Sequence, residues 1–259
     1  MQRMPPDYHR RQQGVALFVV IVFVMLSMLL ALWASRTSLF NELVVGNDAD
    51  YQRAFEAAQA LIQDAELDIR GERADGSSCV GTGDVCRAGI AVRFPPEAKD
   101  VGPLLANLDP QPTQCSKGLC VKRTGKLDFW NNNDTTQGVT LAQMTDTAVG
   151  ARYGQFTGAA VGNEDNPANP ILADTGAFNR GGWYWIEVLP YDESSKNSNL
   201  IVGGPSNLLP LHLTPSVVYR ITAVAFGRKT RPPRTGETGA QPVTVVVLQQ
   251  TYARQRAKD

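Results

Sequence analysis

The sequence predicts an α+β fold in which a long N-terminal helix, apolar in its first half and amphipathic in its second, packs on a small antiparallel β-sheet with a loop-rich middle. Three observations support this prediction. Residues 15–35 carry no charge, the next stretch repeats its apolar residues at helical spacing, and the last third contains β-branched and aromatic runs. The middle third is rich in Gly, Asn, Asp and Pro and shows few periodic runs.

The apolar segment 15–35 is long enough to cross a membrane. Its 21 residues carry no charge, and as a helix they would reach about 30 Å, the thickness of a hydrocarbon core. Secretory signal cores are usually shorter, roughly 7–15 residues, and end at a pair of small residues. The C-terminal end of this segment lacks such a pair. Basic residues gather before the segment, at Arg3, Arg10 and Arg11, and only Arg36 follows closely. This bias predicts a single-pass inner-membrane anchor with a cytoplasmic N-terminus and the remaining chain outside.

The helical pattern continues as an amphipathic half over 36–70. One helix is therefore expected from about Val15 to Arg70. Gly46 and Asn47 interrupt its pattern, so a bend would fall at Gly46, and Asn47 can cap the second half, with acidic Asp48 and Asp50 in its first turn. An apolar stripe then recurs at alternating steps of four and three, through Tyr51, Phe55, Ala58, Ile62, Ala65 and Ile69. The polar residues of this stretch lie mostly away from the stripe: Arg53, Glu56, Gln63 and Asp64. Gly71 suits a left-handed C-terminal cap.

The head, 71–259, ends in a sheet part over 181–254. Three runs there predict strands, 182–191, 216–227 and 242–254, and their connections of roughly 25 and 15 residues favour an antiparallel sheet. One face of the second run is apolar throughout and is expected to meet the helix; it carries Val217, Tyr219, Ile221, Ala223 and Ala225.

The preceding part of the head, 71–180, is loop-rich. Within it, 89–94 and 118–123 resemble short strands, 128–138 a loop and 139–149 a short helix.

Four cysteines lie beyond the apolar segment, at Cys79, Cys86, Cys115 and Cys120. Outside the cytoplasm an even number indicates disulfides, with three possible connectivities. Short glycine-containing loops favour pairing Cys79 with Cys86 and Cys115 with Cys120. Zinc is the alternative, but the spacing of the second pair is loose for metal ligands.

Nothing in the composition indicates catalysis or nucleic-acid binding. The 25 basic and 25 acidic residues balance, and the one basic cluster, 228–234, is expected to be a solvated loop. The two histidines are His9, before the apolar segment, and His212, which stands alone beside prolines. No nucleophile elbow, zinc-protease or phosphate-loop motif occurs, so we expect no enzyme and no cofactor.

A calcium site is a weak hypothesis for the loop 128–138. The oxygen ligands on offer are Asp128, Asn131, Asn132, Asn133 and Asp134. Their spacing does not fit an EF-hand loop, so a solvated turn is the favoured interpretation.

The junction at Gly14 suggests processing on the cytoplasmic side. A peptidase that reads an extended chain just before the membrane needs a small, flexible residue there. Cutting after Gly14 would keep the apolar segment and leave a free amine at Val15. RQQGVALFVVIVFVMLS at this junction resembles the leader and first helical turns of type IV pilins and type II secretion pseudopilins. Together with GNDADYQRAFEAAQALIQDAE, YRITAVAFG and VTVVVLQQTYAR, it resembles minor pilins of the PilX kind, over roughly 10–70 and 216–254.

This resemblance implies a pilin-like fold and a non-catalytic role in the pilus. It implies that prepilin peptidase removes the leader 1–14 and that Val15 is N-methylated. Major pilins usually carry Glu at the fifth mature position, where this chain has Val19, a departure typical of PilX-like subunits and of the type II tip pseudopilin. Val19 suggests a subunit that starts assembly at or near the pilus tip.

The resemblance also implies partners and a location. The helix would bind other minor pilins and the major pilin, and the loops of 71–180 could bind a tip adhesin. The subunit would wait in the inner membrane before entering an extracellular pilus that serves adhesion or twitching motility.

Two alternatives remain at this stage. A tip pseudopilin of a type II secretion system would share the anchor, but the large helical insertion of such subunits has no counterpart in the helix-poor middle of this chain. A membrane-anchored periplasmic enzyme or binding protein would keep its leader intact.

Overall fold

The structure is a computed structural model that describes residues 13–80, 85–95, 100–125, 127–162, 169–190, 217–235 and 239–253. It divides into two compact units, Met1–Ala49 and Asp50–Asp259. The first contains the apolar half of the N-terminal helix, and the second contains the head.

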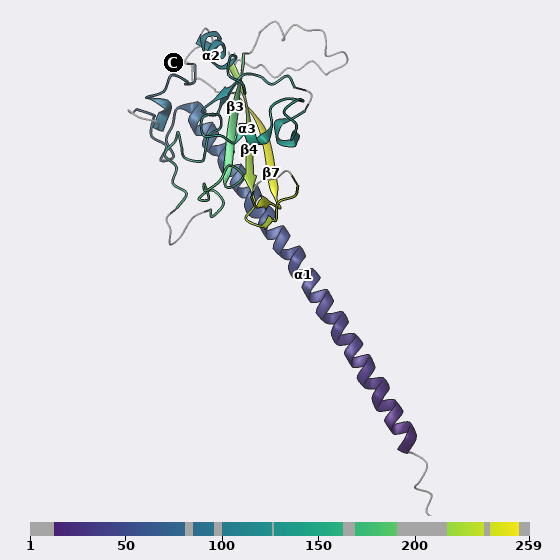
Figure 1. Cartoon of the computed structure of the whole chain (residues 1–259). Helices are drawn as coiled ribbons and strands as arrows, with labels where there is room; N and C mark the ends of the chain where they lie inside the picture. Colours follow the sequence, from purple (N-terminus) through teal and green to yellow (C-terminus); the bar gives the residue numbers. More distant parts are fainter. Residues whose placement is uncertain are drawn as a thin grey trace, which may run out of the picture. The chain divides into compact units, whose positions relative to one another are not determined.

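Helix α1 spans Gln13–Arg70 (Figure 1). The prediction of one helix from about Val15 to Arg70 is confirmed. The cap at Asn47 is wrong, because the helix is continuous through Gly46 and Asn47: neither residue costs enough to break a helix that its neighbours continue. The predicted C-terminal cap is confirmed. Gly71 has φ 70°, its N–H donates to the Asp68 carbonyl at 3.1 Å, and the Glu72 N–H donates to the Leu67 carbonyl at 3.0 Å, which is a Schellman motif.

The head contains a five-stranded sheet in the order β1-β2-β3-β4-β7. Its strands are β1 (Cys115–Ser116), β2 (Leu119–Cys120), β3 (Gly182–Pro190), β4 (Val217–Phe226) and β7 (Val245–Ala253). The three long strands predicted from the sequence are therefore confirmed, and β4 pairs antiparallel with both β3 and β7. The sheet is mixed rather than purely antiparallel, because β2 runs parallel to β3.

The remaining elements are short. They are the two-stranded pair β5 (Thr230–Arg231) and β6 (Gln241–Pro242), helices α2 (Val101–Leu108) and α3 (Leu141–Met144), and the 3-10 turns η1 (Val85–Arg87) and η3 (Phe129–Asn131).

Several predictions for the loop-rich part are wrong. The strand expected over 89–94 is irregular chain, only two residues of 118–123 form a strand, and α2 falls where no helix is predicted. The helix expected over 139–149 is the single turn α3, which a capping box between Thr140 and Gln143 begins. Short segments such as these carry too few apolar residues for periodicity to identify them.

The core lies between the second half of α1 and the inner face of the sheet. As predicted, Val217, Tyr219, Ile221, Ala223 and Ala225 of β4 are buried there, in one cluster with the helix residues Ala54, Ala58, Leu61 and Ala65. The opposite face of the sheet is also covered. Its cluster includes Trp183, Trp185, Phe129, Met144 and Phe226, so loop residues form a second hydrophobic layer.

Leu61 tests how strongly the head depends on this helix–sheet contact. Its side chain is fully buried, so Leu61→Ala should lower the free energy of unfolding of the head by about 2–5 kcal/mol, from lost transfer energy and the cavity left behind. Denaturant unfolding of the full chain in detergent measures this change. Leu127→Ala, at a side chain 46% exposed, is the matched control. Equal effects of the two substitutions would contradict the prediction.

Candidate functional site

The first half of α1 is an apolar surface exposed in the isolated chain. Every described side chain over 15–45 is exposed, including Leu30 at 67% and Trp33 at 71%. Among the described residues, α1 is the one helix long and apolar enough to cross a membrane. An apolar surface of this extent is unfavourable in water and must be covered by lipid or by other protein chains.

Two hydroxyl groups within this surface are satisfied by the helix itself. The Ser27 hydroxyl donates to the Phe23 carbonyl at 2.7 Å, and the Thr37 hydroxyl donates to the Trp33 carbonyl at 3.0 Å. Neither hydroxyl needs water or a partner chain, which suits burial in hydrocarbon.

The predicted processing site lies at the beginning of α1. The helix starts at Gln13, so Gly14 and Val15 belong to its first turn, whereas residues 1–12, with His9, fall outside the described part, as does His212. One turn further, Val19 is 43% exposed. The position where major pilins carry Glu is thus apolar and lies within an uncharged stretch.

Asp50 connects the helix to the end of β4 inside the second unit. Its Oδ1 accepts hydrogen bonds from the backbone N–H groups of Arg228 at 2.8 Å and Lys229 at 3.4 Å. Gly227 makes this approach possible, because a Cβ there would lie 2.2 Å from Asp50 Oδ2. The sequence predicts a helix-dipole role for Asp50. The structure shows a buried tertiary contact in its place.

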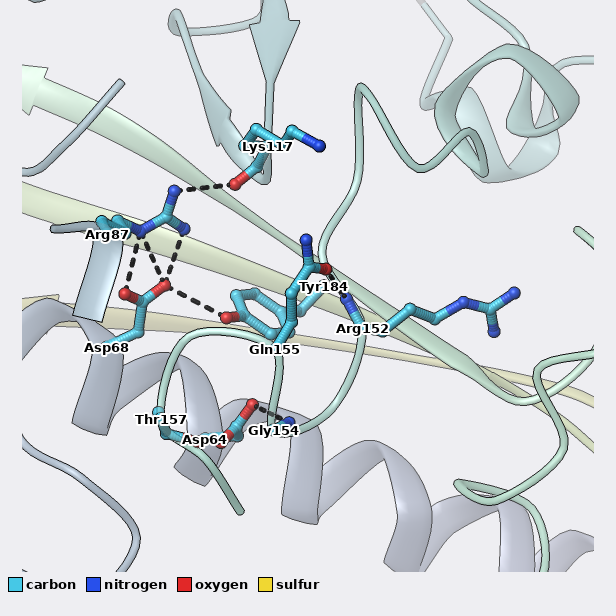
Figure 2. Close-up of polar contacts among 9 residues, drawn as sticks. All are labelled: Asp64, Asp68, Arg87, Lys117, Arg152, Gly154, Gln155, Thr157 and Tyr184. Atoms are coloured by element: carbon cyan, nitrogen blue, oxygen red, sulfur yellow. Dashed lines mark hydrogen bonds and ion pairs between the residues drawn. The ribbon is translucent and has the colours of Figure 1, made fainter. Parts of the chain in front are cut away.

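A buried ion pair links the C-terminal end of α1 to the loops (Figure 2). Arg87 donates from Nε to Asp68 Oδ1 at 2.9 Å and from Nη2 to Asp68 Oδ2 at 2.7 Å, and its Nη1 donates to the Lys117 carbonyl at 2.9 Å. The Tyr184 hydroxyl on β3 donates to Asp68 Oδ2 at 3.1 Å. Burial raises the pKa of Tyr184 well above its usual value, and the Asp68 carboxylate adds to this shift. The hydroxyl therefore keeps the proton that it donates.

The first disulfide presents Arg87 to this network. Cys86 and Arg87 have φ 68° and 52°, a left-handed conformation that non-glycine residues rarely adopt. Cys86 is bonded to Cys79 with an S–S distance of 2.10 Å, the pairing that the sequence favours. The Cys79 N–H donates to the Gly71 carbonyl at 2.8 Å, and the Cys86 N–H donates to the Phe156 carbonyl at 2.8 Å. These bonds fix the turn that directs Arg87 inward, where its guanidinium lies 3.7 Å from the Phe156 ring centroid.

Asp64 is a second buried carboxylate, one helical turn before Asp68. The sequence places it on the exposed side of the stripe, and this is wrong: its side chain is buried, where it accepts hydrogen bonds from the Thr157 hydroxyl and, at 2.8 Å, from the Gly154 N–H. Burial raises its pKa from 3.8 to about 6, although these two hydrogen bonds oppose the shift. The sequence contains one feature that fits this burial: two Asp residues stand four positions apart, each beside apolar neighbours. This feature alone does not predict burial.

The second disulfide and the calcium candidates lie in the loop-rich part. Cys115 and Cys120 are bonded with an S–S distance of 2.05 Å and close the β1–β2 hairpin, again the favoured pairing. In the loop 128–138, the Asp134 carboxylate accepts hydrogen bonds from the N–H of Thr136 at 2.9 Å and from its hydroxyl at 2.7 Å. The structured ranges contain no group of three or more His, Cys, Asp or Glu that could hold a metal ion. Calcium at Asp128, Asn131, Asn133 and Asp134 stays a hypothesis.

These features define a class of protein: a subunit whose exposed apolar N-terminal helix continues into a helix-on-sheet head. Residues 13–62 match the family model described as PilX N-terminal, and residues 111–254 match the model described as Type IV pilus assembly protein PilX C-term. The chain therefore belongs to the PilX family of type IV pilus minor pilins, whose members are structural pilus components. No curated protein and no solved structure matches the chain.

The ion pair of Asp68 and Arg87 should dominate the polar contribution to stability of the head. Removing one partner of a buried pair leaves an uncompensated charge, at a cost of about 3–5 kcal/mol. Arg87→Ala should therefore lower the free energy of unfolding by that amount in denaturant titration. The control is Arg180→Ala, since Arg180 pairs with Asp174 at 3.8 Å with half-exposed side chains, which is worth under about 1 kcal/mol. A loss no larger for Arg87→Ala than for the control would show that the pair does not carry this role.

Asp64 should make the head more stable as the pH falls towards 5. Its folded-state pKa is raised, so its contribution is fully present below the unfolded pKa of 3.8 and is lost as the pH rises through about 6. Between pH 7 and pH 5 this linkage is worth roughly 1 kcal/mol. Unfolding titrations at both pH values should show the gain in the wild-type chain. Asp64→Asn, which mimics the protonated carboxyl, should show a smaller difference; an unchanged difference would rule out Asp64 as its source.

Proposed function

We propose that this chain is a non-catalytic minor pilin that helps start pilus assembly and lies at or near the pilus tip. Prepilin peptidase cleaves between Gly14 and Val15, and the new terminal amine is methylated. The apolar half of α1 then leaves the inner membrane and packs among the helices of other minor pilins and the major pilin. The head contributes to biogenesis and to adhesion or twitching motility.

The observation that carries this proposal is Val19. A charged residue such as Asp at the centre of a membrane helix costs about 2.5–3.5 kcal/mol on insertion scales, and a Glu near the start of the helix is likewise unfavourable unless a charge compensates it. In pilins, the compensating group would be the terminal amine of a preceding subunit. Val19 is uncharged and needs no compensating group. The exposed uncharged surface around it can be covered by lipid until other subunits arrive. A subunit that needs no predecessor is suited to be placed first.

Mass analysis of protein from sheared surface fibres tests the processing step. The expected N-terminus is a methylated Val15. A chain that retains residues 1–14, or one that begins beyond 35, would refute the proposal. Immunogold labelling of the same fibres tests the position: gold should concentrate at fibre ends, and even labelling along the shafts would refute the tip assignment.

Val19→Glu tests the priming role. An unpaired Glu would make the first subunit costly to hold in the membrane and would require a predecessor. We expect at least tenfold fewer pili per cell, counted by electron microscopy, at equal protein level. Val19→Ala keeps the position apolar and should leave the number of pili near that of the wild type. Normal piliation with Val19→Glu would contradict the priming role.

A further inference from the structure

The two edges of the five-stranded sheet differ in a way that bears on binding. At one edge, β1 is two residues long and is closed by the disulfide between Cys115 and Cys120. At the other edge, β7 is nine residues long and pairs with β4 in unbroken register, from Val245 opposite Phe226 to Ala253 opposite Val218. In the described part of the chain, no further strand follows β7.

The outer edge of β7 offers a regular row of backbone groups. The Gly227 N–H donates to the Thr244 carbonyl at 2.8 Å, which makes this a hydrogen-bonded pair of the antiparallel ladder. Because such pairs alternate, the N–H and C=O groups directed away from β4 belong to every second residue of β7. These residues are Val245, Val247, Gln249, Thr251 and Ala253.

β7 lacks the features that protect free edges in natural sheets. Lysines, prolines, bulges or extreme shortness normally prevent edge-to-edge pairing. The described segment 239–253 contains no charged residue, and from Val243 onward it contains no proline. Most side chains of β7 are exposed or half-buried, with Val245 44% exposed. A long, uncharged, regular edge is hazardous for a secreted protein unless another chain covers it.

We propose that β7 is a docking edge that accepts an extended segment of another pilus protein as the next strand of the sheet. Main-chain hydrogen bonds from the outward groups of β7 supply the affinity. The side chains supply selectivity, because alternate residues of the added strand meet the two faces. On the α1 side these neighbours are Val246, Leu248 and Tyr252, together with Gln250, whose side chain donates to Glu66, so that face of the added strand is expected to be mainly apolar.

A second copy of this chain does not fit the edge. Joining two β7 strands antiparallel places a two-fold axis perpendicular to the sheet. This axis would reverse the direction of residues 50–70 of α1, which pack along the sheet, in one copy relative to the other. Subunits of one fibre must point the same way, which rules out antiparallel pairing. Parallel pairing would keep the direction but would place residues 50–70 of the two copies on opposite faces of the joined sheet, whereas the helices of one fibre pack together, so we take the occupant to be a different chain. The inference rests on membership of a pilus family and not on the tip location.

Photocrosslinking in the native host tests the edge. The full chain carries a benzophenone amino acid at Gln249, and cross-linked peptides are identified from sheared pili. Thr251→Pro removes one outward N–H without removing a bond to β4, whereas Thr251→Val keeps that N–H. Thr251→Lys/Ala253→Lys keeps every donor and adds charge to the edge. Thermal unfolding of each variant in detergent reports whether the head is folded.

The expected product joins position 249 to a segment of another pilus protein. Its yield should fall at least fivefold with Thr251→Pro and with the double lysine variant and should stay unchanged with Thr251→Val. If Thr251→Pro does not fold, the lysine variant alone decides the outcome. A cross-link to a second copy, a cross-link within the same chain, no cross-link, or a yield unaffected by added charge would each overturn the proposal. The immunogold labelling of fibre ends tests the tip location, and its outcome does not depend on the cross-linking result.

Discussion

Burial of the apolar stripe of α1 on the inner face of the sheet is the contact on which the rest of the head depends. Leu61 and the three small residues Ala54, Ala58 and Ala65 let the helix lie close to β4. This close approach also determines where polar groups can exist. Asp50, Asp64 and Asp68 lie on the same buried side of the helix, and each accepts hydrogen bonds from a loop or a strand brought to it by the packing, although Asp50 Oδ2 is buried without a partner among the described residues. The loops are thus held to the helix by its carboxylates.

The long elements could be predicted because their sequences repeat. The stripe through Ile69 has helical spacing, and the alternation in 216–227 identifies both the strand and its inner face. The short elements could not be predicted in this way. α2 and η3 depend on tertiary contacts of residues such as Leu108 and Phe129, and no local pattern distinguishes those contacts. The continuity of α1 through Gly46 shows that a weak local breaker does not decide a long helix.

The candidate site also contains residues that a local sequence pattern identifies and residues that only tertiary contacts bring together. Gly14 and Val15 can be singled out in the sequence because they stand at a sharp change from polar to apolar residues, and Val19 because of the resemblance to pilins; their roles stay predictions. The pairing of Asp68 with Arg87 and Tyr184 joins positions far apart in the chain, and one sequence gives no means to connect them. Arg87 also lies between the two ranges, 13–62 and 111–254, that match the family models. Its role follows from the geometry of this chain.

The disulfide between Cys79 and Cys86 sets an order of events during maturation. Thiols stay reduced in the cytoplasm, where the chain is made. There the left-handed turn at Cys86 and Arg87 lacks its covalent link, and noncovalent contacts alone hold the guanidinium beside Asp68. In the proposed topology, with the head outside the inner membrane, oxidation after export supplies this covalent link. That topology implies that the head becomes fully rigid only after it has crossed the membrane.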